Sequence, residues 1–247
     1  MTTAQATDLA RHVLSVVGDV KHGVILYGSQ ARGTSRDDSD IDVLQLVEQN
    51  PRSYSVGPVN VTVYTAAHLS VMANRGSLFV RHLIDEGVIL SDPRGLIASA
   101  LAAYIEPASY LRLKAELRLI LEAMLKPDAV QYRPLLDNLA RFTVRSALYV
   151  RAAELNRPLF DVDAAANAVG VPRIADLIRG PVIEDLGELI DAGVRLLDVS
   201  LPQGVPNSLH AITVWSMNRY PLAFTQLEHA IAGNAQIDYS LLTLPPS

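Results

Sequence analysis

The part of the sequence that most constrains the fold runs from an apolar segment into a glycine turn near the N-terminus. Val24–Tyr27 is short, apolar and rich in β-branched residues, which is typical of a buried strand. It stops at Gly28, where the backbone can turn without a Cβ clash, and Ser29 is expected to cap a helix that starts there. Because the N–H groups at a helix start attract anions, this turn predicts a phosphate site.

A pair of aspartates follows the turn after a polar, glycine-containing loop. Ten residues separate Ser29 from Asp40, and the chain continues as Asp40-Ile41-Asp42 into a second predicted strand. Strand side chains alternate, so Asp40 and Asp42 are expected to share one face. Two neighbouring carboxylates repel each other unless a cation lies between them, and Mg²⁺ prefers such oxygen ligands together with substrate phosphates. An isolated Asp-x-Asp would indicate a surface turn, whereas strand, Gly-Ser turn, loop and strand together favour phosphoryl chemistry.

At these residues the chain resembles the nucleotidyltransferase superfamily of polymerase-beta-like fold, and in particular its small bacterial branch of minimal and antibiotic nucleotidyltransferases. Gly28, Ser29, Asp40 and Asp42 match the family signature without a gap, and the resemblance covers about residues 1–95. It implies transfer of a nucleoside monophosphate from an NTP, usually ATP, to an acceptor, with release of pyrophosphate. It also implies that Asp40 and Asp42 are catalytic and hold Mg²⁺, with two ions expected, while the triphosphate contacts Gly28 and Ser29. Arg32, inside the signature loop, is a further candidate for nucleotide binding.

One departure from the family concerns a third carboxylate, which relatives usually carry on a later strand near the first two. The matching strand is predicted at Val59–Tyr64, where alternation places Asn60, Thr62 and Tyr64 on the metal face, and none of these is acidic. Asn60 offers a neutral oxygen but cannot act as a base. Asp85 and Glu86, at the end of a predicted helix, are weaker substitutes because carboxylates at such ends are usually solvated. The alternative function is therefore a nucleotide-binding regulatory or partner module with little catalytic activity.

Composition narrows the class of protein and of partner. The 247 residues are 49% hydrophobic, carry a net charge of -5 and contain no cysteine, which excludes disulfides, thiolate metal sites and cysteine nucleophiles. No apolar run approaches bilayer length and the first residues lack a signal-peptide pattern, so a soluble cytoplasmic protein without a membrane partner is expected. The acidic balance favours a small molecule or a protein over nucleic acid as the acceptor. The sequence leaves open the acceptor, the nucleotide preference and the oligomeric state.

The pattern of apolar residues predicts two domains. Residues 1–95 are expected to form an α+β nucleotidyltransferase domain, a small mixed sheet with helices, and residues 96–247 an all-α helical bundle. Turn-forming residues at Asp92–Gly95 mark the boundary. We expect the active site in a cleft between the domains, with the acceptor against the helical one. Predicted strands cover residues 22–28, 40–47, 58–64 and 88–90, and predicted helices cover 7–17, 77–86, 109–125, 134–156, 182–197 and 208–232, with shorter ones at 162–169 and 174–178 and one starting at Thr65.

Overall fold

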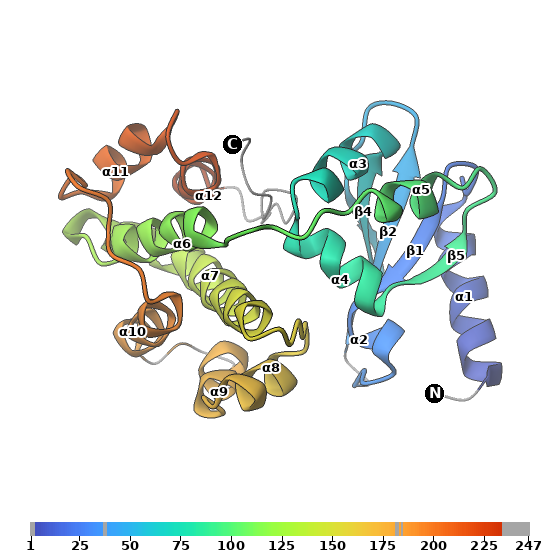
Figure 1. The fold of residues 1–247 in the computed structure, drawn as a ribbon, viewed down its shortest axis with the longest axis horizontal. Coiled ribbons are helices and arrows are strands. Elements are labelled where there is room, and N and C mark those ends of the chain that lie inside the picture. The colour runs from blue at the N-terminus through green and yellow to red at the C-terminus, as the bar shows by residue number, and fades with distance from the viewer. Residues whose placement is uncertain (1–2, 37–38, 181–182, 184, 234–247) are drawn as a thin grey trace. The chain divides into compact units, whose positions relative to one another are not determined.

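The chain folds into two compact units, Met1–Glu106 and Pro107–Ser247. The structure, a computed structural model, describes residues 3–36, 39–180, 183 and 185–233 (Figure 1). The division lies after Glu106 and not at the predicted boundary Asp92–Gly95. The reason is that α5 (Leu96–Ala102) packs on α3 (Ala66–Asn74) and buries Ile97 and Ala100 in the core of the first unit.

The first unit is built on a five-stranded mixed sheet with the strand order β3-β4-β2-β1-β5. Its β2 and β4 run parallel, whereas the pairs β1–β2, β1–β5 and β3–β4 are antiparallel. This confirms the predicted small mixed sheet. The sheet also contains a strand that was not predicted, β3, because this strand is short, is flanked by polar residues and resembles a loop in the sequence. The strands are β1 (Val24–Tyr27), β2 (Ile41–Val47), β3 (Tyr54–Val56), β4 (Val59–Thr65) and β5 (Val88–Ser91).

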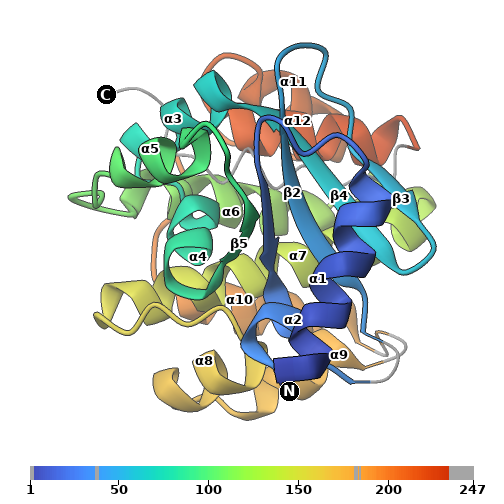
Figure 2. The same cartoon turned by 90° about the vertical axis from the view of Figure 1, so that its right-hand side faces the viewer.

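Helices cover both faces of this sheet, as Figures 1 and 2 show. On one face α1 (Thr3–Val17) packs through Val13 and Val17. On the other face lie α3, α4 (Leu78–Glu86) and α5, packed on Ile25, Leu44, Leu46 and Tyr64. Successive strand residues point to opposite faces, so β1, β2 and β4 each contribute apolar side chains to the core beneath α1 and to the core beneath α3, α4 and α5. The buried strand residues beneath α1 are Val24, Leu26, Ile41, Val43, Val59, Val61 and Val63.

The second unit contains only helices among its described residues. They are α6 (Leu111–Met124), η1 (Pro127–Tyr132), α7 (Arg133–Glu154), α8 (Val162–Val169), α9 (Arg173–Arg179), α10 (Leu186–Leu197), α11 (Leu209–Ser216) and α12 (Pro221–Ile231). The single helix predicted at 208–232 is wrong, because it is divided into α11 and α12. Pro221 lacks a backbone N–H and is tolerated in the first turn of a helix, so a new helix starts there.

Two carboxylates hold the last helix pair to the rest of the second unit. Glu116 on α6, only 2% exposed, accepts hydrogen bonds from the N–H groups of Leu222 (2.7 Å) and Ala223 (3.2 Å) at the start of α12. Asp128 in η1 accepts in the same way from the N–H of Leu209 (2.8 Å) at the start of α11. The N–H groups of a helix start have no partner within the helix, so each carboxylate caps a helix distant in sequence.

No helix in the described part of the chain combines the length and the apolar character that a bilayer crossing requires.

Candidate functional site

The glycine turn sits where β1 meets a short helix, α2 (Gly28–Arg32). Gly28 is buried and has a positive φ of 76°, a conformation that favours glycine over every other residue. The predicted capping role of Ser29 is wrong: the helix begins one residue earlier, Tyr27 precedes it in extended conformation, and no side chain caps it. Ser29 instead lies inside the first turn, and its carbonyl oxygen accepts the N–H of Thr34 at 3.0 Å.

The turn lies directly against one of the two predicted aspartates. Antiparallel pairing of β1 with β2 sets Tyr27 opposite Asp42, which brings the next residue, Gly28, beside the Asp42 carboxylate. A Cβ added to Gly28 would lie only 2.8 Å from Asp42 Oδ2. The structure thus brings together Gly28 and Asp42, and glycine is the residue that leaves room between the turn and the carboxylate.

The other aspartate lies just outside the strand. Asp40 directly precedes β2, whose first residue is Ile41, and Asp40 is exposed whereas Asp42 is partly buried. The difference from the predicted strand start is a single residue, within the usual uncertainty of strand ends. Two further acids of the loop, Asp37 and Asp38, lie outside the described residues.

The position next to Asp42 on the sheet is occupied by Asn60. Parallel pairing of β2 with β4 sets these two residues opposite each other, so their side chains share one face. Asn60 Oδ1 accepts a hydrogen bond of 2.7 Å from Ser55 Oγ on β3. The hydroxyl of Thr62, two residues further along the same face, lies 3.2 Å from that of Tyr27. Tyr64, also expected on the metal face, is buried in the core against Phe79.

The oxygen atoms at this end of the sheet fit a magnesium ion that arrives with a substrate. Among the described residues no group of three or more His, Cys, Asp or Glu side chains is placed to hold a metal ion. The donors present are the carboxylates of Asp40 and Asp42 and the amide oxygen of Asn60. Mg²⁺ commonly takes one or two protein carboxylates and completes its shell with water and substrate phosphates, so this oxygen-only set suits it.

Arg32, predicted to bind nucleotide, forms an ion pair with Glu86 at the end of α4. Arg32 Nη1 lies 2.5 Å from Glu86 Oε2, and the side chains are 18% and 13% exposed. His82 Nε2 lies 3.0 Å from the same carboxylate oxygen. Burial alone would raise the pKa of Glu86, but its contacts with His82 and Arg32 outweigh burial and keep this pKa below its ordinary value. Glu86 is therefore not the solvated carboxylate that its place at a helix end predicted.

Tyr27 connects this ion pair to the sheet. Its ring contacts that of His82 edge to face, with 5.7 Å between the ring centroids, and contacts that of Phe79 in the same way at 5.3 Å. The sequence patterns did not predict the group formed by Arg32, Glu86, His82 and Tyr27. A glycine directly after the helix was the available signal, because a Cβ on Gly87 would meet Ile25 at 2.6 Å, which indicates close packing of the α4 end on β1.

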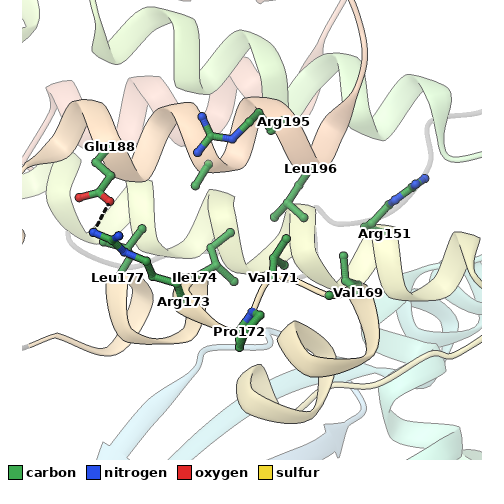
Figure 3. Close-up of a pocket in the computed structure, with 12 residues that line it drawn as sticks. Arg151, Val169, Val171, Pro172, Arg173, Ile174, Leu177, Glu188, Arg195 and Leu196 are labelled. Atoms are coloured by element: carbon green, nitrogen blue, oxygen red, sulfur yellow. Dashed lines mark ion pairs between the residues drawn. The ribbon is translucent and has the colours of Figure 1, made fainter.

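The second unit has a cavity of its own, of about 590 Å³ (Figure 3). Its lining is largely apolar, with arginines at the rim, and Figure 3 shows the ion pair between Arg173 and Glu188, whose atoms lie 3.0 Å apart. None of the residues predicted from the sequence lines it. The lining residues are Arg151, Val169, Gly170, Val171, Pro172, Arg173, Ile174, Leu177, Glu188, Ala192, Arg195 and Leu196.

A comparison with known families gives a match to the first unit and the start of the second. The model of the nucleotidyltransferase domain family matches residues 11–136. This range begins in α1, includes the whole sheet with Gly28, Asp40 and Asp42, and continues through α6 into the start of α7. No curated protein matches the chain.

Proposed function

The chain belongs to the nucleotidyltransferase domain family, and we propose that it transfers a nucleoside monophosphate from an NTP, with ATP as the preferred donor, to an acceptor. The observation that carries this proposal is the contact of the Gly28 turn with Asp42 inside the matched range. A phosphate-binding turn beside a carboxylate would bring a triphosphate and the ligand of its metal ion to one place.

The side chains at the end of the sheet take distinct roles in this proposal. Asp40 and Asp42 would hold Mg²⁺, and Asn60 would offer a neutral oxygen beside them. The bound metal supplies charge stabilisation to the displacement at the α-phosphate. Gly28 and Ser29 would orient the triphosphate. The acceptor's nucleophilic atom forms a bond to the α-phosphorus as the bond to pyrophosphate breaks, and its proton passes to water because Asn60 cannot accept it.

A second candidate is a nucleotide-binding regulatory or partner module with little transfer activity. It is favoured by one observation, that the residue opposite Asp42 on β4 is the amide Asn60, on the strand where the resemblance to the family implies a third carboxylate. A general base contributes about 10²–10⁴-fold to a rate, so its loss would leave a slow enzyme or none. The pair Asp40 and Asp42 argues for transfer, because Mg²⁺ prefers carboxylate oxygens together with substrate phosphates.

One experiment separates the two candidates. The protein would be incubated with Mg²⁺ and NTPs labelled at the α-phosphate, against aminoglycosides, proteins and RNA as acceptors, with Asp42→Asn as the control. Transfer by the wild type and not by the variant supports the enzyme, with a small molecule or a protein as the expected acceptor. Binding of labelled NTP without transfer supports the second candidate. Absence of both would reject the two together.

A further inference from the structure

The helix that carries the glycine turn is too short to be stable alone. α2 spans five residues, from Gly28 to Arg32, and ends at Gly33, which has a φ of 72°. An isolated helix of this length is unstable in water, so its position depends on contacts with the rest of the unit. The pairing of β1 with β2 places Gly28 beside Asp42, but the rest of the turn, from Ser29 to Arg32, depends on whatever holds α2.

The ion pair between Arg32 and Glu86 joins the end of this helix to α4. The two residues are 54 positions apart in sequence, and their side chains meet at 2.5 Å with little exposure to solvent. Glu86 is itself held, because His82 on the same helix contacts the same oxygen at 3.0 Å. Arg32 thus meets a carboxylate that is already oriented and is kept ionised by its neighbours.

This arrangement disfavours a direct role of Arg32 in phosphate binding. To contact the triphosphate, Arg32 would have to leave Glu86, and a largely buried carboxylate would lose its main cationic partner. Breaking a buried pair on one side is strongly unfavourable, because the remaining charge stays desolvated. Arg32 is therefore better suited to hold α2 in place than to bind the triphosphate.

We propose that Glu86 is a positioning residue that holds the phosphate turn in place through Arg32. In this arrangement Arg32 acts as the anchor of α2, and the nucleotide is bound by the turn and by the metal ion. The inference rests on the proposed function, since it concerns the same nucleotide site. It assigns to the end of α4 a role in nucleotide affinity.

The sign of one substitution distinguishes an anchor from a ligand. The full chain would be titrated with Mg²⁺ and ATP by calorimetry, as wild type, Arg32→Ala, Glu86→Ala and the double variant. For an anchor, each single variant loses about tenfold in affinity and the double variant loses little more than either, because both remove one interaction. If Arg32 instead binds phosphate, Glu86→Ala leaves affinity unchanged or raises it, since the arginine is released, and the proposal is overturned.

Two further variants test whether a loss of ATP affinity comes from a general disturbance of α4. Asp85→Ala removes the adjacent carboxylate on α4, which pairs with Arg81 at 2.8 Å and not with α2, so its affinity should match the wild type. Glu86→Gln keeps an oxygen that accepts from Arg32 and should retain more affinity than Glu86→Ala. Equal losses in Asp85→Ala and Glu86→Ala would show a general effect on α4 and contradict the proposal.

A second readout keeps the inference separate from the proposed function. If the wild type does not bind ATP, the proposed function fails, and the anchor is then judged by amide hydrogen exchange. Glu86→Ala and Arg32→Ala should each speed exchange at the Gly33 and Thr34 amides, which bond to carbonyls of α2, whereas Asp85→Ala should not. Unchanged exchange in Glu86→Ala would overturn the anchor.

Discussion

Asp42 and Asn60 lie directly opposite each other on the parallel strands β2 and β4, with their side chains on the same face of the sheet. Asn60 lies on the strand where the resemblance to nucleotidyltransferases implies a third carboxylate. Its amide oxygen is not idle, because it accepts a hydrogen bond from Ser55 at 2.7 Å. Because an amide cannot accept a proton, Asn60 limits the rate of the proposed transfer.

Substitution of Asn60 by Asp places a third carboxylate beside Asp42 with almost no change in size. We expect the transfer rate to rise, by at most the roughly 10²–10⁴-fold that a general base contributes, or Mg²⁺ to bind more tightly. Thr62→Asp is the comparison, because the Thr62 hydroxyl lies 3.2 Å from that of Tyr27 and its loss disturbs that contact. Rates at saturating Mg²⁺ and metal titrations test both variants. Unaltered rate and metal affinity in Asn60→Asp would show that this position does not face the metal.

Removal of a metal ligand should lower the transfer rate without lowering the stability of the fold. Asp42→Asn is expected to reduce transfer by about 10²-fold or more, because charge stabilisation of the transition state depends on the metal. In EDTA the same variant should remain folded, with a free energy of unfolding within about 1 kcal/mol of the wild type, because the amide has nearly the same size as the carboxyl. Urea unfolding with and without Mg²⁺ measures this. A variant that is both active and less stable would contradict the metal assignment.

ATP binding should depend on the metal ion. The triphosphate and the two carboxylates are all anionic, so we expect much weaker binding of ATP in EDTA than in Mg²⁺. Calorimetry under the two conditions measures the difference. Equal affinities would reject Asp40 and Asp42 as metal ligands, whatever happens to the turn.

The turn itself can be tested with a matched pair of glycines. Gly28→Ala adds a Cβ that meets Asp42 Oδ2 at 2.8 Å, in a backbone with φ of 76°. Gly57→Ala introduces similar backbone strain, at φ of 56°, but its Cβ meets nothing within 4 Å. Each variant should lose about 1–2 kcal/mol of unfolding free energy from the left-handed backbone. Only Gly28→Ala should also lose affinity for ATP with Mg²⁺, measured by calorimetry, and an equal loss in Gly57→Ala would refute the special role of Gly28.

The parts of this site that the sequence predicted correctly depend on local patterns. Alternation along Val59–Val63 was enough to place Asn60 on the face opposite the valines, and the register with Asp42 agrees with it. The glycine turn was equally local, because Gly28 follows directly on a β-branched run. The cap position was predicted two residues too late, at Ser29 and not at Tyr27, since a helix can start at the glycine itself when the preceding residue is extended.

The parts that the sequence did not predict depend on contacts between distant residues. Nothing in the sequence around Arg32 or Glu86 indicates that they pair, because the pair forms only when the end of α4 packs on β1. The same holds for Glu116, whose partners at the start of α12 are more than a hundred positions away. A helical stripe shows which face is buried, but not which helix start will lie above it. Tertiary packing decides which helix start lies there, and short sequence motifs do not contain this information.

The two carboxylates that cap α11 and α12 should respond to pH with opposite signs. Burial raises the pKa of Glu116 above its ordinary 4.5 despite the hydrogen bonds that it accepts. Burial would also raise the pKa of Asp128, but the N–H of Leu209 and the contacts with His210 keep it below its ordinary 3.8. Protonation is thus favoured by folding for Glu116 and disfavoured for Asp128.

Comparison with the neutral variants Glu116→Gln and Asp128→Asn exposes this difference. The excess unfolding free energy of wild type over Glu116→Gln should fall as pH rises above 4.5, because ionising the buried carboxyl is harder in the folded state. The excess over Asp128→Asn should instead be lost as pH falls below 3.8. Trp215, the one tryptophan of the chain, lies on α11 and reports urea unfolding of the second unit by fluorescence. If the two pH dependences had the same sign, the assignment of Glu116 as a buried carboxyl that resists ionisation would be wrong.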